Sequence, residues 1–232
     1  MLTDIEKEIN SYKNAGQATA LQRFFKTAKG EYGEGDIFLG IKVPIQRKIV
    51  ARYWKYINLD DTKDLLNSKI HEYRLIALLI LVRKYSKGDT AEKQKIYKIY
   101  LNNRKYINNW DLVDLSAPNI VGEYLLRNDR KVLYKLAKSK SLWDRRIAIL
   151  STFALIRNND FTDSLKISKI LLNDSHDLIH KAVGWMLREI GKRDQKLEES
   201  FLIKYYKTMP RTMLRYAIEK FSEKKRMYYM SK

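Results

Sequence analysis

The feature that most constrains this fold is a helical segment that returns about every 35 residues. Apolar residues recur three or four positions apart, the spacing of one helix face, in "EYRLIALLILVRKY", "WDRRIAILSTFALIRN", "HKAVGWMLREIGKR" and "MLRYAIEKF". A small or β-branched residue marks each segment, with spacings of 36, 35, 34 and 35 residues: Ala77, Val113, Ala148, Ala182 and Ala217. The turn-forming stretches "SKGD", "RNND" and "GKRD" divide the intervals, which leaves room for a second helix in each.

This period predicts the fold class. No segment shows the sustained alternation of a strand, and the chain has only nine glycines and three prolines. Two helices per period are typical of an α-solenoid, which stacks helix pairs into a curved array with an extended concave face. We therefore predict an all-α fold, a single domain over residues 1–232.

The charge of the chain indicates a polyanionic partner. Lys and Arg number 46 against 27 Asp and Glu, a net charge of +19 that is spread along the whole chain. A folded basic surface is therefore expected, and nucleic acid is the favoured partner. Two positions before the marker residues stand Leu75, Asp111, Arg146, His180 and Arg215. The later repeats thus place polar or cationic groups at equivalent points, so we expect a basic concave groove for a phosphate backbone.

Several classes of site are excluded or disfavoured. The chain has no cysteine, which excludes disulfides, thiol nucleophiles and cysteine-based zinc sites. His176 and His180 lie four residues apart without an evident third ligand, so we expect no metal and no cofactor. The stretch "KGEYGEGD" lacks the Lys-Ser/Thr ending of a phosphate-binding loop and is interpreted as a loop near the nucleic acid.

No membrane segment is expected either. The N-terminal stretch lacks an apolar signal core, and the longest apolar run, residues 75–82, has eight residues and is typical of a buried helix. We expect a soluble cytoplasmic protein that does not bind membranes.

Asp114 departs from the repeat pattern. It takes the position after the marker residue, which is aliphatic in the other four repeats (Leu78, Ile149, Val183 and Ile218). Trp110 precedes it by four residues, so both side chains share one helix face. Asn108 or Asn109 is expected to cap this helix, and Pro118 to end it or kink it. A carboxylate in such a position either pairs with a neighbouring Lys or Arg, or faces water in a functional cleft.

The sequence resembles the bacterial AlkD family of DNA alkylation repair glycosylases over about residues 20–222. The resemblance rests on "FFKTAKGEYGEGDIFLGIKVP", "NNWDLVD", "LWDRRIAIL", "IHKAVGWMLREIGKRD" and "KTMPRTMLRYAIEKF". It implies a stack of HEAT-like helical repeats. It also implies a monomeric enzyme that excises cationic alkylated purines, such as 3-methyladenine and 7-methylguanine, from double-stranded DNA.

The resemblance also assigns residues. It implies that Asp114 is the catalytic acid, with Trp110, Arg146 and Trp185 completing the catalytic set. Contacts with DNA would come from Lys181, Arg188 and Arg215, and in the N-terminal region from Phe24, Lys26 and Lys42. The chain departs from the family pattern in one region, because better-studied members carry a glutamine or similar residue near Lys42 and a different aromatic near Phe24.

These residue types suit the implied chemistry. A purine alkylated at N3 or N7 leaves as a neutral base, so the reaction needs no general acid and one carboxylate can suffice. An ionised Asp114 would stabilise the oxocarbenium-like deoxyribose and orient water. Trp110 and Trp185 would surround the cation with electron-rich rings, and Arg146 would hold a phosphate. The alternative is a non-enzymatic HEAT-like module that binds nucleic acid or an acidic protein.

Overall fold

The computed structural model describes residues 1–231, which form two compact units, residues 1–121 and residues 122–231. Within the described residues the regular secondary structure is helical, and the only strand-like pairing is an isolated parallel bridge between Ile37 and Ile70. The all-α prediction is confirmed. Among these residues, no helix combines the length and the apolar character needed to cross a membrane. The single-domain organisation over residues 1–232 stays a prediction.

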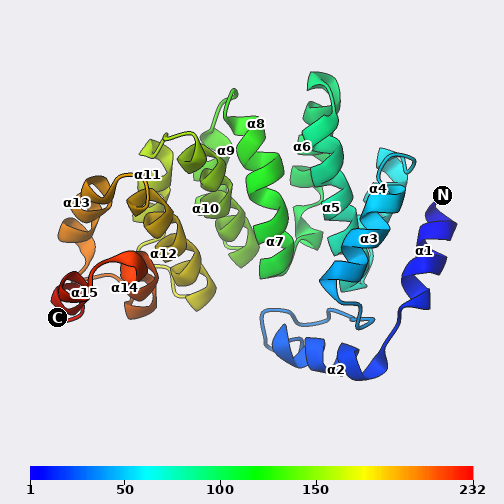
Figure 1. The fold of residues 1–232 in the computed structure, drawn as a ribbon, viewed down its shortest axis with the longest axis horizontal. Coiled ribbons are helices and arrows are strands. Elements are labelled where there is room, and N and C mark those ends of the chain that lie inside the picture. Colours follow the sequence, from blue (N-terminus) through cyan, green and yellow to red (C-terminus); the bar gives the residue numbers. More distant parts are fainter. Residues whose placement is uncertain (232) are drawn as a thin grey trace. The chain divides into compact units, whose positions relative to one another are not determined.

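The first unit consists of helices joined by short turns, apart from one long irregular segment, residues 25–42 (Figure 1). Its helices are α1 (Leu2–Ser11), α2 (Ala15–Phe24), α3 (Val43–Tyr53), α4 (Leu59–Leu66), α5 (His71–Lys87), α6 (Thr90–Asn102), η1 (Arg104–Tyr106) and α7 (Trp110–Ala117). A π-helical turn, η2 (Pro118–Gly122), follows α7. The long α5 is central to this unit, since it contacts α3, α4, α6 and α7.

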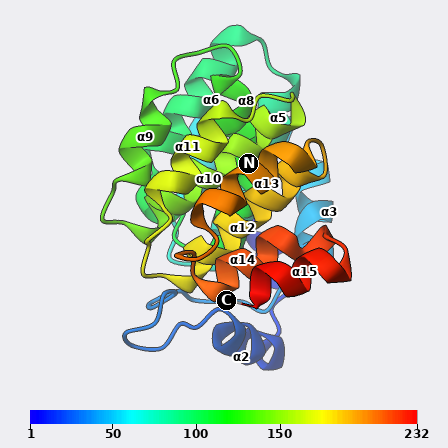
Figure 2. The ribbon, with the colours of Figure 1, turned by 90° about the vertical axis from the view of Figure 1, so that its left-hand side faces the viewer.

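The second unit is built in the same way around α12 (Figure 2). Its helices are α8 (Glu123–Leu125), α9 (Lys131–Ala137), α10 (Leu142–Arg157), α11 (Thr162–Ile170), α12 (Asp177–Gly191), α13 (Gln195–Tyr205), α14 (Arg211–Ala217), η3 (Ile218–Lys220) and α15 (Glu223–Met230). Helix α12 contacts α10, α11, α13 and α14.

The sequence repeat corresponds to helix pairs. The marker residues lie in α5, α7, α10, α12 and α14, and each is at most 1% exposed: Ala77, Val113, Ala148, Ala182 and Ala217. Helices α6, α9, α11 and α13 fall in the intervals between them. Two of the predicted turns end in N-caps, because Asp89 accepts the amide of Glu92 and Asp194 accepts that of Leu197. The helical repeat is therefore confirmed as a property of the folded chain.

The irregular segment 25–42 is held against the start of α5 by one buried carboxylate. Glu72 accepts the backbone amides of Leu39, Gly40 and Ile41 at 3.0, 2.8 and 3.1 Å. Successive amides that converge on one anion form a nest, and they compensate the carboxylate for the water lost on burial. Glu72 is only 1% exposed, so this contact is part of the core of the first unit.

Gly40 allows the close approach that this nest requires. Its φ is +84°, and a Cβ atom there would lie 2.1 Å from the carbonyl oxygen of Asn14 and 2.6 Å from the amide of Ala18. A side chain would therefore force α2 away from the segment. Gly35 has the same φ of +84°, but nothing lies within 4 Å of its Cβ position.

Substitutions at Gly35 and Gly40 separate the cost of backbone strain from the cost of steric overlap. We expect Gly35→Ala to lower the free energy of unfolding by about 1 kcal/mol, the strain of a left-handed residue. We expect Gly40→Ala to lower it by a further ~1–3 kcal/mol, the usual range for overpacking. Denaturant unfolding of both variants measures the difference, and equal losses would show that α2 does not pack tightly on residue 40.

Candidate functional site

Helix α7 presents the two residues that the sequence singled out. Asn109 caps it by accepting the amide of Trp110 at 2.8 Å, and Pro118 follows its last residue, as expected. Its inner face is fully buried and consists of Leu112, Val113, Ser116 and Ala117. Trp110 and Asp114 lie on the other face, one turn apart, and both are half-buried.

Asp114 differs from its repeat counterparts in burial as well as in chemistry. The four aliphatic residues in the equivalent position are at most 2% exposed: Leu78, Ile149, Val183 and Ile218. The buried phenol of Tyr100 is close enough to Asp114 for its pKa to respond to that charge, and its hydroxyl is 3.0 Å from Ser116 Oγ. Burial raises the pKa of Tyr100, and the negative charge of Asp114 adds to the rise, so the phenol stays neutral. Asp114 is thus half-buried, and the buried phenol near it is neutral and hydrogen-bonded.

Aromatic side chains hold Trp110 in place. The ring of Phe25 stacks on the indole with centroids 5.1 Å apart, and the ring of Phe24 meets it edge-on at 5.8 Å. Phe25 is buried, whereas Phe24 is 62% exposed. The structure therefore brings two predicted site residues together, Phe24 and Trp110, and it adds Phe25, which the sequence did not single out.

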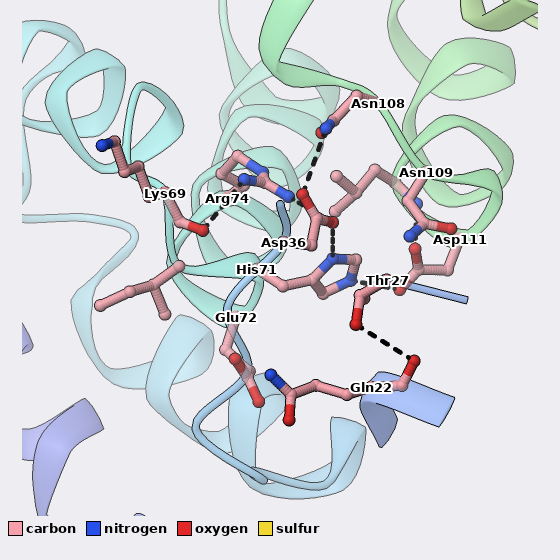
Figure 3. Close-up of polar contacts among 12 residues, drawn as sticks. Gln22, Thr27, Asp36, Lys69, His71, Glu72, Arg74, Asn108, Asn109 and Asp111 are labelled. Carbon is pink, nitrogen blue, oxygen red and sulfur yellow. Dashed lines mark hydrogen bonds and ion pairs between the residues drawn. The ribbon is translucent and has the colours of Figure 1, made fainter. Parts of the chain in front are cut away.

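A buried polar network centres on His71 (Figure 3). His71 Nδ1 is 3.1 Å from Asp36 Oδ2, and His71 Nε2 is 2.9 Å from Asp111 Oδ2. The three residues come from different elements: Asp36 from the segment 25–42, His71 from the first turn of α5, and Asp111 from the first turn of α7. The imidazole therefore bridges two carboxylates that are distant in the sequence.

Further groups complete this network. Arg74 forms an ion pair with Asp36 at 2.7 Å, and Asn108 donates to the other oxygen of Asp36 at 3.1 Å. The second oxygen of Asp111 accepts the amide of Leu112 at 2.8 Å. His71, Asp36 and Arg74 are each less than 5% exposed, so these side chains are almost fully removed from the protein surface.

The network shifts two pKa values in opposite directions. Burial disfavours the charged imidazole, but the charge of Asp111 and the hydrogen bonds with Asp111 and Asp36 outweigh it and raise the pKa of His71. Burial would also raise the pKa of Asp36, but its hydrogen bond with His71 and the charges of Arg74 and His71 hold it below its usual value.

Sequence reasoning missed this network. In the sequence, Asp111 is only one of the residues two positions before the markers, and His71 stands beside a single acidic neighbour, Glu72. Asp36 lies in the glycine-rich stretch that was expected to lie near nucleic acid, yet it is 4% exposed and turned inward. The only signal in the sequence for this network is Asp36 itself, an acidic residue at the end of a glycine-rich loop.

The predicted residues of the second unit occupy two neighbouring helices. Arg146 in α10 is 5% exposed and donates from Nη1 to the carbonyl of Leu178, in the first turn of α12. Trp185 in α12 is half-buried, lies 5.9 Å from the ring of Phe153 and donates to Glu189. Arg146 thus helps to fix the start of the helix that carries Trp185.

The predicted DNA contacts differ in their surroundings. Lys181 pairs with Asp177 at 2.9 Å, Arg188 forms an ion pair with Glu219, and Arg215 is exposed. In the first unit, Lys42 is exposed before α3, and Lys26 has a φ of 52° and lies 5.9 Å from the ring of Tyr32. In residues 1–231, no three His, Asp or Glu side chains are arranged to hold a metal ion.

Comparisons with known proteins agree with this fold. A sequence model of the family described as "DNA alkylation repair enzyme" matches residues 5–221. The chain is also similar in structure to a protein described as "Predicted DNA alkylation repair enzyme from Enterococcus faecalis". The TM-score is 0.72 at 16% identity, over 91% of this chain and 97% of that chain. At this identity the likeness concerns the fold. No curated protein matches the chain.

The raised pKa of His71 predicts how stability depends on pH. The stabilisation from its charged form is complete below the unfolded pKa of 6.5 and is lost as pH rises through the higher folded value. We expect the difference in unfolding free energy between wild type and His71→Asn to shrink above pH 6.5. One proton gives a slope of at most about 1.4 kcal/mol per pH unit. Denaturant unfolding at several pH values measures this difference, and a constant difference would contradict a charged His71.

Proposed function

Because the chain belongs to the DNA alkylation repair enzyme family, we propose that it is a DNA glycosylase for cationic alkylpurines. Its substrates would be lesions such as 3-methyladenine and 7-methylguanine in duplex DNA, and the reaction would hydrolyse the bond between the base and the deoxyribose. The family match spans nearly the whole chain and supports a role in DNA repair. The glycosylase activity and the residue roles below are the proposal.

The observation that carries the proposal is the position of Asp114. In the equivalent position the other repeats bury aliphatic side chains, whereas Asp114 stays half-buried one turn after Trp110. A carboxylate in this position costs free energy of desolvation that an aliphatic side chain would not cost. The exception therefore supports a chemical role, which positions that break a local rule often have.

The chemistry requires little more than a negative charge and a cation-binding surface. Departure of a cationic base leaves positive charge on the deoxyribose, and the base itself leaves as a neutral molecule. Ionised Asp114 would stabilise that charge and orient the water that attacks C1′. The indole of Trp110, which contacts both Phe24 and Phe25, would face the same cation with its electron-rich ring.

The second unit would contribute mainly to DNA binding. Arg146 carries a guanidinium, a group that is suited to a phosphate, on α10, and it contacts the first turn of α12 through Leu178. Trp185 would add a second aromatic surface on α12. The net charge of +19 supports a salt-sensitive contact with the DNA backbone, to which Lys181, Arg188 and Arg215 would add.

The decisive experiment measures release of 7-methylguanine and 3-methyladenine from methylated duplex DNA under single-turnover conditions. We expect wild-type protein to release both above the spontaneous rate. We expect Asp114→Asn to be slower by about a hundredfold or more, because it removes the charge that stabilises the transition state. Asp64→Asn is the matched control, since Asp64 is an exposed aspartate in α4, and it should keep the wild-type rate.

Two outcomes would contradict the proposal. Wild-type protein that binds methylated DNA tightly without releasing bases would favour the non-enzymatic binding module instead. Equal rates for wild type and Asp114→Asn would remove Asp114 from the reaction.

Arg146→Ala tests the role of the second unit. We expect both DNA affinity and the rate of base release to fall, since the variant loses a phosphate donor and the contact with Leu178. The control is Arg127→Ala, which removes the same charge from an exposed position, and it should change affinity by about twofold at most. Arg146→Ala with normal affinity and rate would exclude Arg146 from the site.

A further inference from the structure

We propose that His71, in its doubly protonated form, is the positioning residue of this site and holds Trp110 and Asp114 in place through Asp36 and Asp111. The inference rests on the proposed function for its effect on catalysis. His71 does not contact the proposed reacting groups. It acts through the two elements that carry and flank them.

The hydrogen-bond geometry requires two protons on His71. Both ring nitrogens face carboxylate oxygens, Nδ1 at 3.1 Å from Asp36 and Nε2 at 2.9 Å from Asp111. A carboxylate accepts and does not donate, whereas a neutral imidazole has only one N–H. Only the imidazolium can donate to both, so loss of one proton breaks one of the two contacts.

The charges around His71 lead to the same conclusion. On its own helix it has Arg74 and Glu72, and the carboxylate of Glu72 is compensated by three backbone amides. Segment 25–42 contributes Asp36, and α7 contributes Asp111. With charged His71, two cations (His71 and Arg74) face two carboxylates. With neutral His71, Arg74 alone would face both in a buried site.

Two routes connect this contact to the site. The first is α7 itself, because Asp111 is in the first turn of this helix, next to Trp110 and three residues before Asp114. The second is a stack of rings: His71 on Phe38 at 4.3 Å, Phe38 on Phe25 at 5.1 Å, and Phe25 on Trp110 at 5.1 Å. Loss of the Asp36 or Asp111 contact would therefore loosen both the start of α7 and the aromatic wall that fixes Trp110.

His71 can exchange its proton without unfolding of the unit. A cavity of about 320 Å³ lies beside it, and its lining includes His71, Asp111, Glu72 and Phe38, with the exposed Lys42 among the remaining residues. This volume accommodates several water molecules. The proton on His71 can therefore respond to the pH of the solvent while the first unit stays folded.

The first test follows Trp110 in the free protein and needs no DNA. In a variant in which Trp54, Trp143 and Trp185 are replaced by Phe, Trp110 is the remaining indole. We expect its fluorescence to change as pH rises above about 6.5, when His71 loses its proton. Asp111→Asn removes one of the two charges that hold the proton, so it should move this transition to lower pH by about one unit or more. Asp64→Asn should leave the transition unchanged.

The second test follows the pH dependence of 7-methylguanine release, corrected for spontaneous loss. We expect the wild-type rate to fall on the alkaline side in step with the Trp110 transition, and Asp111→Asn to shift this fall to lower pH. His71→Asn should lack the alkaline fall and be slower by about tenfold at about pH 7. Its DNA affinity should stay within about twofold of wild type.

The outcomes separate this inference from the proposed function. A Trp110 transition that Asp111→Asn moves to lower pH would support the positioning role, whether or not the wild-type protein releases a base. Failure of the wild-type protein to release a base would reject only the glycosylase proposal. A Trp110 signal that does not change with pH, or one that Asp111→Asn leaves in place, would overturn the positioning role. Because Asp111→Asn keeps His71, the test does not depend on the folding of His71→Asn.

Discussion

The bridge from His71 to Asp36 and Asp111 is the contact on which the organisation of the first unit depends. It joins an irregular segment, the first turn of α5 and the first turn of α7, which are separated by 35 and 40 residues in the chain. Burial makes the bridge sensitive to each partner, because a buried charge without its counter-charge is costly. The positions of Trp110 and Asp114 are therefore linked to the ionisation of His71, which takes no part in the proposed reaction.

Glu72 complements this bridge from the neighbouring position. The segment 25–42 has no helix of its own, so its backbone amides need other acceptors, and the buried carboxylate of Glu72 satisfies three of them. Gly40 makes the approach possible, since its backbone conformation and its contact with Asn14 exclude a side chain. Two adjacent residues of α5 thus hold the segment at two points, and the segment in turn supplies Phe25, which stacks on Trp110.

The periodic part of the structure was predictable because each repeat obeys the same local rule. The marker residues are buried in helices of the repeat, two of the predicted turns end at the N-caps Asp89 and Asp194, and α7 ends before Pro118. Asp114 stood out against that regularity. The bridging histidine did not stand out, because Asp36 lies in a segment without a helix and Asp111 is 40 residues away, which is off the repeat spacing. Arg146 was assigned to a phosphate, and the structure adds a buried contact with Leu178 that the spacing did not reveal.

The sequence alone determined the helical class, the period, the basic character and the exceptional position of Asp114, because all four depend on residue type and spacing along the chain. Tertiary structure alone decided that Asp36 turns inward, that Asp111 is a network residue and that His71 has a carboxylate at each ring nitrogen. The physical reason is that hydrogen bonds between distant segments depend on how the chain brings those segments together. Nothing in the spacing of 36, 71 and 111 specifies that approach.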